Sequence, residues 1–307
     1  MSKIYDSFLF FNELDLLDIR LTILDPYVDY FIISECDYTF SGNKKPFYFD
    51  DNKDLFSKFL HKIIHVKNLN SGIVDNFENT YTGRKKEIFD EIILKYSSIK
   101  NTPETDYGKD YWCREYLHRE FIKLGMENCE DDDIILFSDT DEIPNLEILG
   151  DLKQLDTEKK YCFLQDNNNF FVNNISSTNW KGNILSSYKH IKNESLNFIR
   201  KESKRDHSPS FNYVQSGGWH LSFMGGPERI KEKIKSYGHQ EFNNPSILGN
   251  VENSIKLNKD LFFRTSTTYR SSTEEFYFDN MKKVELDGYF PEKVVKLIEE
   301  KYKYLIK

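Results

Sequence analysis

Two aspartates separated by one residue, Asp139 and Asp141, follow the four apolar residues Ile-Ile-Leu-Phe at 134–137. Where a strand ends in irregular backbone, residues two apart can turn to the same side, so both carboxylates can approach one divalent cation. Their hard oxygen atoms favour Mg²⁺ or Mn²⁺. An isolated Asp-x-Asp is a weak signal, because solvated acidic turns are common, but the apolar run before it strengthens the metal-site interpretation.

Paired glycines precede two further residues that can do chemistry. His220 lies in a short apolar run after Gly217-Gly218, and Glu228 follows Gly225-Gly226 and Pro227, where a helix is expected to begin. An imidazole can ligate a metal or form hydrogen bonds inside a core. A carboxylate in a first helical turn can act as a base or only stabilise the helix terminus. The residues alone leave both alternatives open.

The elements that must position these residues have the pattern of an α/β fold. An apolar run at 4–11 predicts a strand, the leucine spacing over 12–25 predicts a helix that ends before Pro26, and 30–34 predicts a second strand. This βαβ unit implies parallel strands. Further strands are expected at 62–66 and 134–137, and helices at 84–97 and 110–125. Ligands of such sheets bind beyond the carboxyl ends of the strands, where Asp139 and Asp141 stand.

The second half of the chain is less regular. The residues around Pro144 suit the start of a helix, and strands are expected at 161–165 and 168–172, before a long polar loop at 173–212. A strand at 217–223, a helix at 227–237 and an outer C-terminal helix at 291–305 complete the prediction. We expect one catalytic domain over 1–307, with 259–307 as a C-terminal helical appendage.

Composition narrows the class of protein. The 307 residues are 38% hydrophobic and 15% aromatic, enough for a packed core, so disorder is not expected. A net charge of −8 provides no extended basic surface, which excludes nucleic acid as the expected partner. Acidic residues interrupt the N-terminal apolar run, and no segment approaches the roughly 18 apolar residues of a membrane span. The expectation is therefore a soluble, cytoplasmic protein without signal peptide or anchor.

Four stretches together resemble glycosyltransferase family 17. They are residues 12–20 (Asn-Glu-Leu-Asp-Leu-Leu-Asp-Ile-Arg), 34–42, 138–144, and 218–223 followed by Pro227-Glu228. The resemblance implies a GT-A type, Rossmann-like single domain with a mixed central sheet, Mn²⁺ or Mg²⁺, a nucleotide-sugar donor, and inversion at the anomeric carbon. The family's best-known member uses UDP-N-acetylglucosamine, so the expected reaction transfers that sugar to a hydroxyl of a glycan or glycoconjugate acceptor. The acceptor itself is left open.

The resemblance also implies roles for the residues around the metal. Asp141 is expected as a direct ligand, whereas Asp139 either shares the metal or contacts ribose or a metal-bound water. Glu142 either supports the ligands through hydrogen bonds or is only an acid at a helix start. His220 is expected to complete the metal site, with His239 as the alternative ligand.

The remaining roles concern the base and the donor. Glu228 is expected to remove the acceptor proton, with Asp166 and Glu241 as alternatives. Contacts with the donor are expected from Asn12, Glu35, Arg114, Arg119 and Trp219. Glu35 can instead begin a turn, the arginines can be solvated, and Trp219 can either stack on a sugar or fill the core.

Two other functions use the same residues. A Mg²⁺-dependent phosphohydrolase also clusters aspartates, although it usually adds further carboxylates around two metals. A non-catalytic carbohydrate-binding protein would retain the acids without using them. Phosphate release from simple esters, or glycan binding that is insensitive to chelator, would favour these alternatives.

Overall fold

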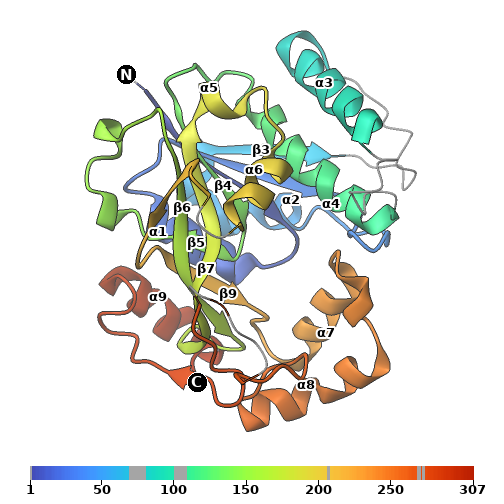
Figure 1. Cartoon of the computed structure of the whole chain (residues 1–307), viewed down its shortest axis with the longest axis vertical. Coiled ribbons are helices and arrows are strands. Elements are labelled where there is room, and N and C mark those ends of the chain that lie inside the picture. Colours follow the sequence, from blue (N-terminus) through green and yellow to red (C-terminus); the bar gives the residue numbers. More distant parts are fainter. Residues whose placement is uncertain (1, 69–80, 100–108, 206–207, 268–270, 272–273) are drawn as a thin grey trace.

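A computed structural model of the chain describes residues 2–68, 81–99, 109–205, 208–267, 271 and 274–307. Helices cover both faces of a mixed sheet (Figure 1). Its strands follow the order β3-β2-β1-β4-β7-β6-β9-β5, with β8 beside β6 and β10 beside β7. The predicted α/β class with a mixed central sheet is confirmed.

The first half of the sheet is parallel. β1 (Ile4–Phe10) lies between β2 (Tyr30–Cys36) and β4 (Ile134–Asp139), and β3 (Ile63–Asn68) extends the sheet beyond β2. The connection from β1 to β2 is α1 (Leu14–Leu24), as predicted. The chain moves outward from β1 to β3 and then returns to β4 on the other side of β1. The carboxyl ends of β1 and β4 therefore flank a topological switch point, the usual position of a ligand site in open α/β sheets.

The second half of the sheet is mixed. β7 (Asn174–Ser187) runs antiparallel to β4 and to β6 (Lys160–Asn169), whereas β9 (Gly218–Ser222) runs parallel to β6. The short β5 (Glu142–Pro144) pairs antiparallel with β9 at the edge. β8 (Phe211–Val214) runs parallel to β6, and β10 (Lys282–Lys283) pairs antiparallel with β7. The predicted strand at 217–223 is confirmed as β9.

Three predictions for this half are wrong. The two strands expected at 161–165 and 168–172 are one strand, β6, and the helix expected near Pro144 is the strand β5. The loop expected at 173–212 contains β7, α5 (Tyr188–Ile191), α6 (Leu196–Ser203) and the start of β8. β7 is rich in polar residues and is nevertheless mostly buried, because its polar side chains form hydrogen bonds within the sheet. For example, Ser176 Oγ donates to the carbonyl of Asn167 at 3.0 Å.

The helices form layers over separate apolar clusters. One face packs on α1 and α9 (Glu292–Lys301), and the other on α3 (Gly83–Ile99), α4 (Asp110–Glu120), α5 and α6. A third cluster lies between the sheet end and the helices α7 (Pro227–Ser236) and α8 (Pro245–Leu257). The described residues also form the short helix α2 (Tyr48–Asn52) and 3-10 segments at Lys53–Lys62, Phe121–Met126, Glu147–Leu149, Leu152–Gln154, Gln240–Phe242 and Lys303–Leu305.

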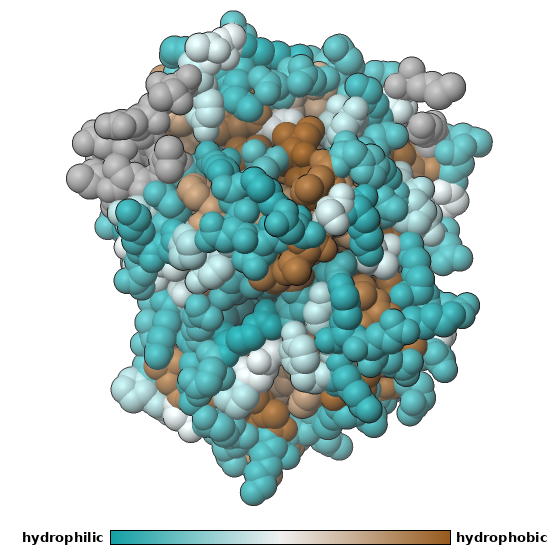
Figure 2. Space-filling model, turned by 180° about the vertical axis from the view of Figure 1, so that it is seen from behind, coloured by the Kyte–Doolittle hydropathy of each residue, from teal (hydrophilic) through white to brown (hydrophobic). Residues whose placement is uncertain are grey.

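Hydrophilic side chains cover most of the face seen in Figure 2, and hydrophobic ones appear between them in separate groups. None of the helices in the described part of the chain has the length and apolar character needed to cross a membrane.

The C-terminal segment is tied to the sheet and to α1. Its helix α9 and the following 3-10 turn correspond to the helix predicted at 291–305. The carbonyl of Leu305 accepts a hydrogen bond from the Val172 amide at 2.9 Å, and Tyr304 donates to the Asp15 carboxylate on α1 at 2.7 Å. Arg229 of α7 binds the same carboxylate at 2.5 and 2.9 Å. Asp15 therefore connects α1, α7 and the C-terminus.

Candidate active site

The acids occupy the turn between β4 and β5 at the switch point. β4 ends at Asp139, which is one-third exposed, and β5 begins at Glu142, which is fully buried. Thr140 Oγ1 donates a hydrogen bond to the carbonyl of Leu9 in β1. The predicted position of these acids, directly after a buried strand, is confirmed.

Two arginines bind the carboxylate of Asp139 from different helices. Arg119 of α4 reaches Oδ1 at 3.1 Å, and Arg200 of α6 reaches Oδ2 at 3.1 Å. Arg119 is itself held by Glu115 at 3.2 Å and by Asn197 Oδ1 at 2.7 Å. Burial alone would raise the pKa of Asp139, but Arg200 and Arg119 lower it below its ordinary value.

Glu142 is the most tightly held acid. Both of its oxygens accept hydrogen bonds from Arg200, at 2.7 and 2.6 Å, and Oε1 also accepts from Trp180 Nε1 at 2.8 Å. Although burial opposes ionisation, the adjacent Arg200 holds the pKa of Glu142 well below the usual range. The site therefore contains a buried carboxylate whose ionised form is stabilised by a bidentate guanidinium pair.

Asp141 lies next to a lysine and a histidine. Lys233 of α7 approaches Oδ2 at 2.6 Å, and His220 Nε2 lies 3.7 Å from the same oxygen. Burial is the largest influence and would raise the pKa of Asp141, yet Lys233 and His220 together lower it well below its usual value. The structure thus brings His220 of β9 to the acidic turn, next to Asp141, although the two residues are far apart in the sequence.

Trp180 holds the histidine in place. Its ring stacks on the imidazole of His220 with 4.6 Å between centroids and 24° between planes. Lys204, which follows the last residue of α6, lies over the Trp180 ring at 3.8 Å from the centroid. Burial and the neighbouring Arg200 lower the pKa of Lys204 to about 8. Because these contacts use the ring and its N–H, Trp180 orients His220 and Glu142.

The charges in this cluster are balanced. A fifth acid, Glu13, lies close enough to interact with Lys233 and Asp141, but burial raises its pKa and so favours its neutral form. The other four carboxylates stand beside four cations, and they are Asp139, Asp141, Glu142 and Glu115 with Arg119, Arg200, Lys204 and Lys233. The cations that contact the acids are already paired, so a diphosphate bound there would bring uncompensated negative charge into a partly buried site.

Asp141 and His220 fit a divalent cation best. A carboxylate oxygen and an imidazole nitrogen 3.7 Å apart are donors of the kind that Mn²⁺ accepts. In the described part of the chain, no three His, Cys, Asp or Glu side chains are grouped closely enough to hold a metal alone. The remaining ligands would then be phosphate oxygens and water, a common arrangement for Mg²⁺ beside nucleotides. Such a cation would compete with Lys233 for Asp141.

Three residues expected at the donor make contacts within the protein. The Glu35 carboxylate is fully buried and accepts hydrogen bonds from Lys45 Nζ at 3.2 Å and from the Phe49 amide at 3.3 Å. Arg114 donates to the carbonyl of Phe40 at 2.9 Å. Both therefore hold the segment after β2. The backbone amide of Asn12 donates to Glu13 Oε2 at 3.0 Å in the turn after β1. Their roles in donor binding stay predictions.

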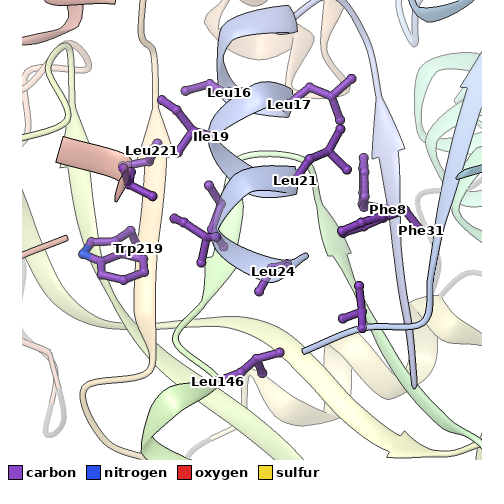
Figure 3. Packing of buried hydrophobic residues seen from close by; sticks show 14 of the residues in the cluster. Phe8, Leu16, Leu17, Ile19, Leu21, Leu24, Phe31, Leu146, Trp219 and Leu221 are labelled. Carbon is purple, nitrogen blue, oxygen red and sulfur yellow. The ribbon is translucent and has the colours of Figure 1, made fainter. Parts of the chain in front are cut away.

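Trp219 lies in the core, the second of the two alternatives for this residue. It is 5% exposed and stacks on Phe290 at 4.8 Å, beside Leu221 and the side chains of α1 (Figure 3). Neighbours in a strand face opposite sides of a sheet, so Trp219 is directed away from the face of His220. Asp166 lies opposite Trp219 in the pairing of β6 with β9. Its carboxylate accepts a hydrogen bond from the Tyr289 hydroxyl at 3.2 Å, on the same face of the sheet as Trp219.

The expected base is at the surface. Glu228 occupies the first turn of α7, as predicted, but its side chain is 87% exposed and pairs with Lys231 at 3.1 Å. The alternative acid Glu241 pairs with the exposed His239 at 2.7 Å. These contacts bring none of these three residues to Asp141. The roles of Glu228 and Glu241 as a base, and of His239 as a metal ligand, stay predictions.

The sequence interpretation missed four residues of the site. Trp180, Arg200 and Lys204 fall in the stretch read as a loop, and Lys233 is one of several lysines on α7. One signal was present: residues 195–203 begin with a serine that caps the Phe198 amide and continue with apolar residues at helical spacing. That pattern predicts α6 and would have drawn attention to Arg200.

The pKa shifts predict an acid-sensitive fold. Asp139, Asp141 and Glu142 all have folded-state pKa values below the ordinary ones, so their contribution to stability is present above roughly pH 5 and is lost progressively as the pH falls below the ordinary carboxyl range toward the lower folded-state pKa values. We expect the urea midpoint to fall between pH 6 and pH 3, and the difference between wild type and Asp141→Asn to shrink over the same range.

The control is Asp132→Asn, which removes an exposed acid at the other end of β4. Its midpoint should follow that of the wild type at every pH. If the Asp141→Asn and wild-type curves stayed parallel from pH 6 to pH 3, Asp141 would not have the lowered pKa.

Comparison with known proteins identifies a family from the sequence but no curated relative. The sequence model of Glycosyltransferase family 17 matches residues 1–95 and 70–306. No curated protein matches the chain. Among solved structures, HddC from Yersinia pseudotuberculosis is similar at 11% identity over 73% of this chain and 91% of that chain, with a TM-score of 0.31. Its complex with GMP-PN is similar at 12% identity over 76% and 97%, with a TM-score of 0.28. Such low TM-scores establish no shared fold.

Proposed function

The chain belongs to glycosyltransferase family 17, and we propose that it is an inverting, metal-dependent enzyme of GT-A type over residues 1–307. In this proposal it transfers N-acetylglucosamine from UDP-N-acetylglucosamine to a hydroxyl of a glycan or glycoconjugate. Glycosyl transfer follows from the family. The donor, the metal and the stereochemistry are our proposals, and the acidic turn at the switch point is the observation that supports them.

The charge balance supports the need for a metal. Every carboxylate of the turn is paired with a protein cation, so the site has no excess positive charge for a diphosphate. Asp141 and His220 would hold Mn²⁺ or Mg²⁺, with Asp139 nearby. The bound metal would supply positive charge to the departing diphosphate.

The chain's own residues would orient the leaving group. Arg119 and Arg200 are held by their ion pairs with Asp139 and are largely buried, with side chains 7% and 13% exposed, and the part of each guanidinium that remains exposed suits phosphate oxygens. Lys233 is tied to Asp141 and would move to the diphosphate if the metal took its place. Glu228 at the start of α7 is the proposed base, and an acceptor bound over this helix terminus would bring its hydroxyl to that carboxylate.

The test is donor turnover without an acceptor. The protein is incubated with UDP-N-acetylglucosamine, UDP-glucose or UDP-galactose and Mn²⁺, and UDP release is followed with and without EDTA. We expect slow release that is fastest with UDP-N-acetylglucosamine and is abolished by EDTA. Release of inorganic phosphate from p-nitrophenyl phosphate, without UDP release, would instead favour a phosphohydrolase.

A further inference from the structure

The buried arginine of α1 contacts the backbone of the acidic turn. Arg20 is fully buried and forms a two-point ion pair with Asp6 of β1, through Nε at 2.8 Å and Nη2 at 2.6 Å. Its guanidinium also lies over the Phe8 ring, 4.3 Å from the centroid. A buried arginine with one carboxylate partner has further N–H groups that need acceptors.

The backbone of residues 139–142 supplies those acceptors. The two N–H groups of Arg20 Nη1 donate to three carbonyls, those of Asp139 at 2.9 Å, Thr140 at 3.1 Å and Glu142 at 2.9 Å, so at least one hydrogen is shared between two of them. The carbonyl that Arg20 does not reach, that of Asp141, accepts from the Leu221 amide at 2.8 Å. All four carbonyl oxygens of the turn are therefore bound from the interior of the protein.

Ser138 adds a second contact between Arg20 and the turn. Its Oγ accepts from Arg20 Nη2 at 2.8 Å and from Asn183 Nδ2 at 2.9 Å, and it lies 3.1 Å from the carbonyl of Asp139. Three carbonyl dipoles that converge on one point would repel one another without a cation between them.

We propose that Arg20 is a positioning residue that fixes the acidic turn by binding its inward-facing carbonyls, so that the carboxylates of Asp139, Asp141 and Glu142 are presented to the ligand in one arrangement. The inference rests on the proposed function, because it assumes that these carboxylates bind the metal and the donor. Arg20 itself touches neither. Its effect on binding comes from preorganisation of the turn.

The test compares two variants of α1 that both lose stability. Arg20→Lys keeps the charge beside Asp6 but cannot reach three carbonyls and a hydroxyl at once. Leu24→Ala removes a fully buried side chain one helical turn away, without touching the acidic turn. UDP affinity in the presence of Mn²⁺ is measured by calorimetry at a temperature where circular dichroism shows each protein to be folded.

We expect Arg20→Lys to weaken UDP binding at least tenfold, and Leu24→Ala to stay within twofold of the wild type. Equal affinities in Arg20→Lys and wild type would overturn the inference, as would a matching loss in Leu24→Ala. If Arg20→Lys does not fold, Ser138→Ala is used instead. A UDP affinity of Ser138→Ala within twofold of the wild type then overturns the inference. A wild type that binds no UDP would refute the proposed function itself, which is a different result.

Discussion

Replacing Asp141 with asparagine is expected to lower kcat/KM for donor turnover by at least about a hundredfold. The amide keeps the size of the side chain but removes the charge that would hold the metal beside His220, whose Nε2 lies 3.7 Å from Asp141 Oδ2. It also leaves the ammonium group of Lys233 without the carboxylate that it contacts at 2.6 Å. The measurement is UDP release from UDP-N-acetylglucosamine over a range of Mn²⁺ concentrations.

Asp132→Asn is the matched control, because it makes the same chemical change at the opposite end of β4. It should retain the turnover and the Mn²⁺ dependence of the wild type. An Asp141→Asn enzyme that saturates at the wild-type Mn²⁺ concentration and turns over at the wild-type rate would remove Asp141 from the metal site.

Arg200→Met is expected to destabilise the protein by about 3 kcal/mol, because it leaves a buried carboxylate without its partner. Glu142 is fully buried and receives two hydrogen bonds from Arg200, whose Nη2 also bridges to Asp139. Trp180 would remain as a neutral donor to Glu142. The free energy of unfolding is measured by urea denaturation at pH 7.

The double variant Arg200→Met with Glu142→Gln separates the ion pair from the packing. Because it removes both charges, it should be more stable than Arg200→Met alone, with a positive coupling energy in the double-mutant cycle. Additive effects of the two substitutions would mean that the pair seen in the structure contributes no interaction of its own. Donor turnover should be lost in both variants, since Arg200 also binds Asp139.

The parallel half of the fold follows from local pattern. Buried parallel strands are continuous apolar runs, such as Phe31-Ile32-Ile33 in β2. The helix α1 is predicted by leucines at helical spacing between β1 and β2. The position of Asp139 and Asp141 could be predicted for the same reason: the strand before them is apolar and the acids mark its end. Sequence pattern therefore located the acidic turn that we propose binds the metal.

The rest of the site depends on contacts between distant segments. β7 is rich in Asn, Ser and Thr, and its polar side chains are satisfied inside the sheet by partners that no local pattern reveals. From the sequence, Trp180 is therefore assigned to a loop, although it lies in β7 and stacks on His220. Arg20 looks like one polar residue in an apolar helix, and only the fold shows that it binds carbonyls about 120 positions later.

The most direct test of the account is calorimetric titration of the wild-type protein with UDP, in the presence of Mn²⁺ and then with EDTA. The balanced charges around Asp139 and Asp141 predict saturable binding with Mn²⁺ and at least about tenfold weaker binding without it. UDP binding of equal affinity in both conditions, or no binding in either, would contradict the claim that these acids hold a cation that receives the diphosphate.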